Sequence, residues 1–119
     1  MKDLKSLQKK IEKFVSDRDW AQFHSLKNLS MSLSIEAAEL MEHFQWVDAD
    51  DYDQEDLDED KFEEIREEIA DVMIYSLMLS SKMGIDPLTT IAEKIEKNEE
   101  KYPVQKVKGS AKKYTEFKE

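Results

Sequence analysis

Turn-forming residues are almost absent from this sequence, and that shortage limits what the chain can fold into. Its 119 residues contain two glycines and two prolines. A phosphate-binding P-loop needs paired glycines and a dinucleotide-binding fingerprint needs three close together, so neither motif can be assembled here. A sheet-rich fold also needs more turn residues than these. We therefore expect a single all-α domain of modest size that spans residues 1–119.

Two further absences narrow the class of protein. The chain has no cysteine, which excludes a disulfide framework, a thiolate nucleophile and Cys-ligated zinc. No stretch approaches the ~18 uninterrupted apolar residues of a membrane span, and no apolar segment typical of a signal peptide follows the start. We therefore expect a soluble, cytoplasmic protein without a membrane partner.

Charge is distributed unevenly along the chain. Eighteen basic and 28 acidic residues give a net charge of −10. Residues 48–60 hold nine acids and no lysine or arginine, whereas residues 101–118 hold six lysines and one acid. Because so many like charges repel one another in a helix, we expect an acidic loop at 48–60 and a basic, irregular tail at 104–119. The acidic total also excludes the basic stripe that a nucleic-acid partner requires.

Apolar residues recur at helical spacing in four segments. The predicted helices cover about 3–16, 24–47, 62–83 and 87–101. Gly84 suits the C-terminal cap of the third helix, and Asp86 followed by Pro87 suits the start of the fourth. These helices predict a four-helix, bundle-like fold. The second helix is apolar nearly all round, which favours burial in an oligomer.

Acidic residues flanked by apolar residues mark the two middle helices. Glu36 and Glu39 lie three positions apart on the second helix, and Glu68 and Asp71 repeat the spacing on the third. Buried carboxylates are costly unless they pair with cations or metal. Four oxygen donors in a dry groove suit a hard divalent cation such as Mg²⁺ or Mn²⁺. The spacing alone is common by chance in so acidic a chain, and solvated or salt-bridged helix faces are the alternative interpretation.

Aromatic and histidine residues near these carboxylates allow two interpretations. Trp20, Trp46 and Tyr75 are either ordinary core residues or a stacking surface for a nucleobase. His24 lies near a predicted helix start, where it can act as a cap. His43 fits a helix interface better than a metal site.

Several motifs, taken together, give the chain a recognisable pattern. They are RDWAQFH at 18–24, Asn28, EAAEL at 36–40, FQW at 44–46, EEIADVMIY at 67–75, Asn98 before KYP at 101–103, and KKYT at 112–115. This pattern resembles the MazG-type all-α nucleoside triphosphate pyrophosphohydrolases, and within them the dCTP pyrophosphatase branch. The resemblance covers nearly the whole chain. It implies hydrolysis of dCTP or a related pyrimidine deoxynucleotide to the monophosphate and pyrophosphate.

The resemblance also implies roles for particular residues. Mg²⁺, or Mn²⁺ in its place, would be held by Glu36, Glu39, Glu68 and Asp71. Among these, Glu36, Glu39 and Glu68 are equal candidates for the catalytic base. The family's base pocket maps onto four residues, namely Trp20, His24, Trp46 and Tyr75. Asn98 and Lys101, which belong to the same motif pattern, are further candidate substrate contacts. Family members assemble as dimers or tetramers with shared sites, so a homodimer or homotetramer is expected.

Two positions depart from the family pattern. Ile35 occupies the first position of a pair that is a doubled glutamate in the wider MazG pattern, which leaves the identity of the base open. Ile11 stands where the dCTP pyrophosphatase branch can place a histidine, which leaves the preferred base open.

Two functions of other classes compete with this interpretation. A di-iron carboxylate protein needs Glu-x-x-His pairs, and neither histidine here lies three residues after a glutamate. A non-catalytic helical interaction or regulatory protein would instead use the carboxylates as interface salt bridges.

Overall fold

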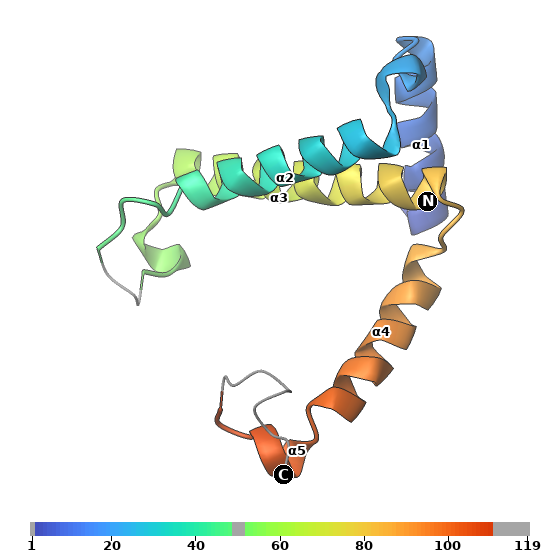
Figure 1. Ribbon diagram of the computed structural model, residues 1–119. Coiled ribbons are helices and arrows are strands. Elements are labelled where there is room, and N and C mark those ends of the chain that lie inside the picture. The colour runs from blue at the N-terminus through green and yellow to red at the C-terminus, as the bar shows by residue number, and fades with distance from the viewer. Residues whose placement is uncertain (1, 49–51, 111–119) are drawn as a thin grey trace. The chain divides into compact units, whose positions relative to one another are not determined.

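The computed structural model describes residues 2–48 and 52–110, and every regular element in these ranges is helical (Figure 1). The helices are α1 (Leu4–Asp17), α2 (Leu26–Glu42), α3 (Glu59–Lys82), α4 (Pro87–Lys101) and α5 (Val104–Val107). Short 3-10 turns occupy Ala21–Phe23 and Gln54–Asp56. The predicted all-α fold class is confirmed. None of the helices in the described ranges combines the length and the apolar character needed to cross a bilayer.

Side-chain caps explain where the two middle helices begin. Ser25 Oγ accepts a hydrogen bond from the Asn28 amide at 3.0 Å, which starts α2. Asp58 Oδ1 accepts one from the Lys61 amide at 2.7 Å, which starts α3. Such caps satisfy amide groups that have no partner inside a helix. Asp86 precedes α4 with Pro87 at the first helical turn, as the sequence predicts.

The boundaries differ from the predicted ones at three places. Helix α2 ends at Glu42, five residues before the predicted end, and residues 43–46 form turns. Helix α3 begins at Glu59, inside the segment expected to be an acidic loop. Helix α5 lies within the expected irregular tail, of which residues 111–119 fall outside the described residues.

Residues 1–84 and 85–119 are two separate compact units, and each is described by itself. In the first unit, α2 and α3 run side by side as an antiparallel hairpin, and α1 packs on α3 (Figure 1). Gln8 Nε2 donates to Ser81 Oγ at 3.3 Å and links α1 to α3. The second unit contains α4 and α5. The single-domain organisation stays a prediction.

Little apolar side-chain surface is buried in the described part of one chain. Leu29 is 2% exposed and Ile65 is 7% exposed, and they are its buried core residues. By contrast, Met31 and Ile35 on α2 and Met73 on α3 are more than half exposed. Helix α4 presents an exposed apolar stripe that consists of Leu88, Ile91 and Ile95. Exposed apolar surface of this extent is typical of interaction faces.

Gly84 ends α3 in the left-handed region with a φ of 67°, and a Cβ built there meets nothing within 4 Å. Since no neighbouring atom is in the way, the cost of Gly84→Ala comes only from the alanine Cβ, which crowds its own backbone at positive φ. We expect its free energy of unfolding to fall by about 1 kcal/mol. Urea denaturation at one protein concentration measures the change. Gly84→Asn is the control, and it should lose less because asparagine tolerates this conformation.

Candidate metal centre

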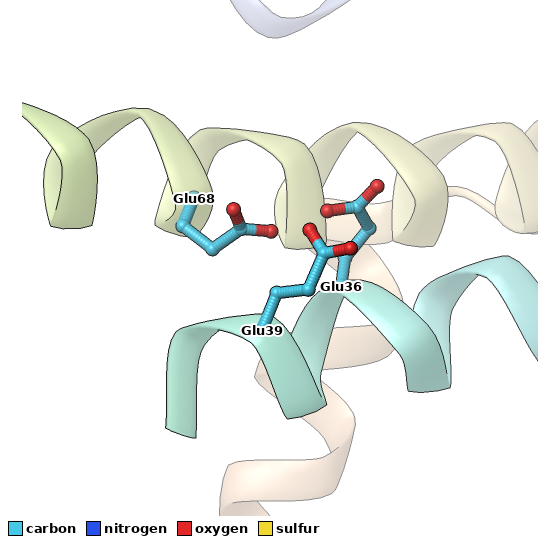
Figure 2. Close-up of side chains that lie close together, drawn as sticks. All are labelled: Glu36, Glu39 and Glu68. Atoms are coloured by element: carbon cyan, nitrogen blue, oxygen red, sulfur yellow. The ribbon is translucent and has the colours of Figure 1, made fainter. Parts of the chain in front are cut away.

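Three glutamates meet between the two helices of the hairpin (Figure 2). Glu36 and Glu39 come from α2, and Glu68 comes from α3. One carboxylate oxygen from each lies within 4.8 Å of the other two. Residues three apart share a helix face, so the spacing on α2 directs both side chains toward α3. Glu36 and Glu68 are half-buried, whereas Glu39 is exposed.

The electrostatics of this glutamate cluster favour a positive charge at its centre. Glu68 Oε1 is buried and has no hydrogen-bond partner among the described residues. The pKa of Glu36 is raised to about 8, first because a protonated Glu36 can donate to the Glu68 carboxylate, then because of burial and the nearby Glu39. Like charges and desolvation both disfavour ionisation. A proton therefore relieves the repulsion at neutral pH, and a bound cation would do the same.

The donor set fits a hard divalent cation. Carboxylate oxygens are the ligands that Mg²⁺, Mn²⁺ and Ca²⁺ prefer, and the unpartnered Glu68 oxygen offers a free acceptor. The cluster can therefore bind a metal ion, and residues Glu36, Glu39 and Glu68 would hold it. It contains no histidine, unlike the Glu-x-x-His sites of di-iron proteins.

Asp71, the fourth predicted ligand, is exposed on α3 one turn beyond Glu68. The group of converging oxygens found in the described residues consists of the three glutamates without it. Its part in metal binding stays a prediction.

The structure places Trp20 and Trp46 beyond opposite ends of α2. Trp20 precedes α2 and packs edge-on against Phe14, with ring centroids 5.7 Å apart. Trp46 follows α2 and is 85% exposed. The 17 residues of α2 lie between them, a helix about 25 Å long. Tyr75 is half-buried on α3, one turn after Asp71.

Asn98 and Lys101, the remaining predicted substrate contacts, lie on α4 in the second unit. Both assignments stay predictions.

A pocket of about 380 Å³ lies between α1, the 3-10 turn and the hairpin. Its apolar wall includes Ile11, Val15, Leu29 and Met78. Polar groups also line it, and His24 is one of them. Four lining residues were already noted in the sequence, namely Ile11, His24, and Asp19 and Ala21 of the RDWAQFH motif. The others could not be grouped with them from the sequence, because the lining comes from separate segments.

Residues of this pocket and of the glutamate cluster lie on the same two helices, α2 and α3. Leu29 in the pocket and Glu36 in the cluster lie seven residues apart on α2. Glu68 and Tyr75 lie seven apart on α3, and Met78 of the pocket follows Tyr75 by three. Residues seven apart lie on the same helix face, about 10 Å apart along the axis. Leu29 of the pocket and Glu36 of the cluster therefore lie on one face of α2, and Glu68 and Tyr75 lie on one face of α3.

Comparisons with known proteins agree with this arrangement. Residues 31–117 match the profile of the MazG-like family. The chain belongs to the MazG-like family. This confirms the resemblance inferred from its motifs. The match covers α2 from Met31 onward and all of α3 and α4, and so it includes all three glutamates.

Individual relatives extend the match toward the N-terminus. The chain is 35% identical over 104 residues to dCTP pyrophosphatase 1 of Rattus norvegicus and 33% identical to that of Homo sapiens. Each match covers 87% of this chain and 61% of the relative, so the chain spans less than two thirds of these proteins. The crystal structure of a pyrophosphatase from Archaeoglobus fulgidus is 43% identical, with a TM-score of 0.79. That match covers 87% of this chain and 94% of the other.

The raised pKa of Glu36 predicts how pH affects the metal-free protein. A carboxyl group whose pKa rises on folding stabilises the fold below its unfolded pKa, and that contribution is lost as pH rises toward about 8. Glu36→Gln removes the ionisable group. We expect this variant to unfold several degrees higher than wild type at pH 8.5 in EDTA, with a smaller difference at pH 5.

Thermal scans at the two pH values measure this difference. Glu42→Gln is the matched control, because Glu42 is an exposed carboxylate on the same helix outside the cluster. An equal pH dependence in Glu36→Gln and wild type would contradict the assigned coupling among the three glutamates.

Proposed function

We propose that this protein is a metal-dependent nucleoside triphosphate pyrophosphohydrolase. The observation that carries the proposal is the convergence of Glu36, Glu39 and Glu68 within 4.8 Å on the hairpin of a MazG-like chain. The metal is Mg²⁺, with Mn²⁺ as a substitute. The substrate is dCTP or a related pyrimidine deoxynucleotide, a choice supported by relatives named dCTP pyrophosphatase 1.

The distance between pocket and cluster supports a nucleotide substrate. About two helical turns separate Leu29 from Glu36, which is comparable to the length of a nucleoside between its base and its phosphates. Apolar walls suit the faces of a base, and the glutamate end suits a cation that carries a triphosphate. Tyr75, half-buried on α3 seven residues after Glu68, is the residue that we expect to contact the sugar.

The reaction is attack of water on the α-phosphorus. A bond forms between the water oxygen and the α-phosphorus, and the bond from that phosphorus to the oxygen bridging to the β-phosphate breaks. Pyrophosphate leaves, and the nucleoside monophosphate remains. A cation held by Glu36, Glu39 and Glu68 would neutralise phosphate charge and so favour the displacement. One of the three glutamates, in its ionised form, accepts the proton of the attacking water.

The site is completed by a second copy of the chain. Trp20 and Trp46 lie at opposite ends of α2, so one chain cannot bring both rings to a single small base. The exposed apolar residues of α2 and α3, among them Met31, Ile35 and Met73, offer a surface for a second hairpin. We infer a homodimer, or a tetramer built from it, in which Trp46 of one chain contacts the base held by the other.

Removal of the metal or its ligands tests the proposed reaction. We expect no pyrophosphate release from dCTP in EDTA and recovery with Mg²⁺ or Mn²⁺. Glu39→Gln and Asp71→Asn should each lower the rate by more than ~100-fold, because each removes a charged oxygen donor. Pyrophosphate release from a panel of nucleoside triphosphates measures the effect and reveals the preferred base.

Glu42→Gln is again the control, and its rate should equal that of wild type. Circular dichroism should show that all three variants fold, since loss of clustered negative charge relieves repulsion. Full activity in Glu39→Gln would overturn the site assignment. No hydrolysis of any nucleotide by the wild-type protein would favour a non-catalytic helical interaction protein.

Mixed oligomers test whether two chains share one site. Trp46→Ala and Glu39→Gln should each be poorly active alone. After the two variants are refolded together, part of the activity should return, because a mixed dimer contains one site with intact glutamates and an intact partner tryptophan. Steady-state rates of the mixture, with mass spectrometry to confirm mixed oligomers, provide the measurement.

A second mixture serves as the control. Trp20 lies just before His24, which lines the pocket on the glutamates' own chain. Trp20→Ala mixed with Glu39→Gln should therefore recover no activity. In the mixed dimer, one site lacks the Trp20 ring and the other lacks the Glu39 carboxylate. Equal recovery in both mixtures, or in neither, would contradict the proposed assignment of Trp46 to the partner.

A further inference from the structure

Asp19 adopts a backbone conformation that non-glycine residues rarely use. Its φ is 53°, and it is the non-glycine residue with positive φ in the described ranges. It follows α1, where the Asp19 amide donates to the Ser16 carbonyl at 3.0 Å and the Trp20 amide donates to the Val15 carbonyl at 3.1 Å. This pair of hydrogen bonds ends many helices, and glycine or asparagine is favoured at the position Asp19 occupies. An aspartate here accepts an energetic cost that glycine would avoid.

The same residue lines the pocket between α1, the 3-10 turn and the hairpin. Asp19 Oδ2 accepts a hydrogen bond from Gln22 Nε2 at 3.2 Å, and that nitrogen also donates to the Asp19 carbonyl at 2.9 Å. Within the described part of the chain, Asp19 forms no ion pair, and its Oδ1 has no hydrogen-bond partner. Asp19 is exposed at the pocket, whose lining also includes the charged side chains of Glu12 and Lys82. Its carboxylate is oriented by Gln22 and has one free acceptor oxygen beside the apolar side chains of the pocket.

An ionised carboxylate distinguishes bases by their exocyclic groups, because it accepts hydrogen bonds and cannot donate them. Cytosine presents an amino group at position 4, which donates, whereas uracil and thymine present a carbonyl oxygen there. A carboxylate next to that oxygen would bring two acceptors together without a proton between them. Desolvation of both groups then opposes binding.

We propose that Asp19 determines base specificity by accepting a hydrogen bond from the exocyclic amino group of the nucleobase. The proposal rests on the proposed function and goes beyond it by assigning the residue that selects cytosine over uracil and thymine. The free Oδ1 accepts the bond, and Gln22 keeps the carboxylate in position from the other oxygen. Glycine would fit this turn without strain, but it has no side-chain acceptor. The proposed role therefore explains why an aspartate occupies the position.

Asp19→Asn separates this role from a structural one. Asparagine tolerates the left-handed conformation as well as aspartate does and is nearly the same size. Its amide can donate as well as accept, so it no longer opposes a carbonyl oxygen at position 4. A residue needed only to end α1 would leave base preference unchanged on this substitution.

The experiment compares kcat/KM for dCTP and dUTP in the wild-type protein, Asp19→Asn and Asp17→Asn. We expect wild type to prefer dCTP, and the dCTP to dUTP ratio to fall by about tenfold or more in Asp19→Asn, the effect of losing one hydrogen bond to a charged group. The melting temperature should not fall. Asp17→Asn is the control, because Asp17 pairs with Lys13 at 2.7 Å outside the pocket, and its ratio should equal that of wild type.

A second variant keeps the test decisive. Asp19→Gly suits the φ of 53° and removes the carboxylate, so it should fold and show the same loss of preference. A wild-type ratio in either active variant, or no preference for dCTP in the wild-type protein, overturns the role of Asp19. Absence of hydrolysis with every nucleotide would instead overturn the proposed function, so the two failures are distinguishable.

Discussion

The mutual repulsion of three carboxylates between two packed helices is the constraint on which the rest of the first unit depends. Glu36, Glu39 and Glu68 lie close enough that Glu36 retains its proton to a pH of about 8. Apolar contacts must therefore hold α2 and α3 together on either side of the cluster. Leu29, two turns before Glu36, and Ile65, one turn before Glu68, are the buried residues that do so. The hairpin thus maintains an electrostatically unfavourable arrangement that a cation would convert into a favourable one.

Much of the fold was predictable because each of the four long helices carries apolar residues at helical spacing. The start of α3 was not predicted, since a run of acids suggested a solvated loop. In the structure Asp58 caps the helix, and Glu59 and Asp60 lie in its first turn, where the helix dipole favours negative charge. The end of α2 was also missed. Phe44 and Val47 continue the apolar pattern, although the chain leaves the helix after Glu42.

The candidate site was predictable in part for a similar reason. Spacing of three residues places Glu36 beside Glu39 on one helix face in any α-helix. Which side chains meet across the interface depends on how each helix is rotated, and sequence does not specify that rotation. Glu68 therefore contributes to the group of converging oxygens, whereas the metal-binding role of Asp71, one turn later, stays a prediction. The pocket could not be predicted because its lining residues come from distant segments and because the φ of Asp19 is a property of the folded turn.

The exposed apolar faces of α2, α3 and α4 leave few buried contacts to stabilise the fold of a single chain. With Leu29 and Ile65 as the buried core of the described residues, a single chain has little internal apolar contact to oppose its conformational entropy. Any surface that covers Met31, Ile35 and Met73 therefore stabilises the native state by mass action. If a second copy of the chain supplies that surface, as proposed above, resistance to heat depends on protein concentration as well as on sequence, and dilution alone would loosen a chain whose covalent structure is unchanged.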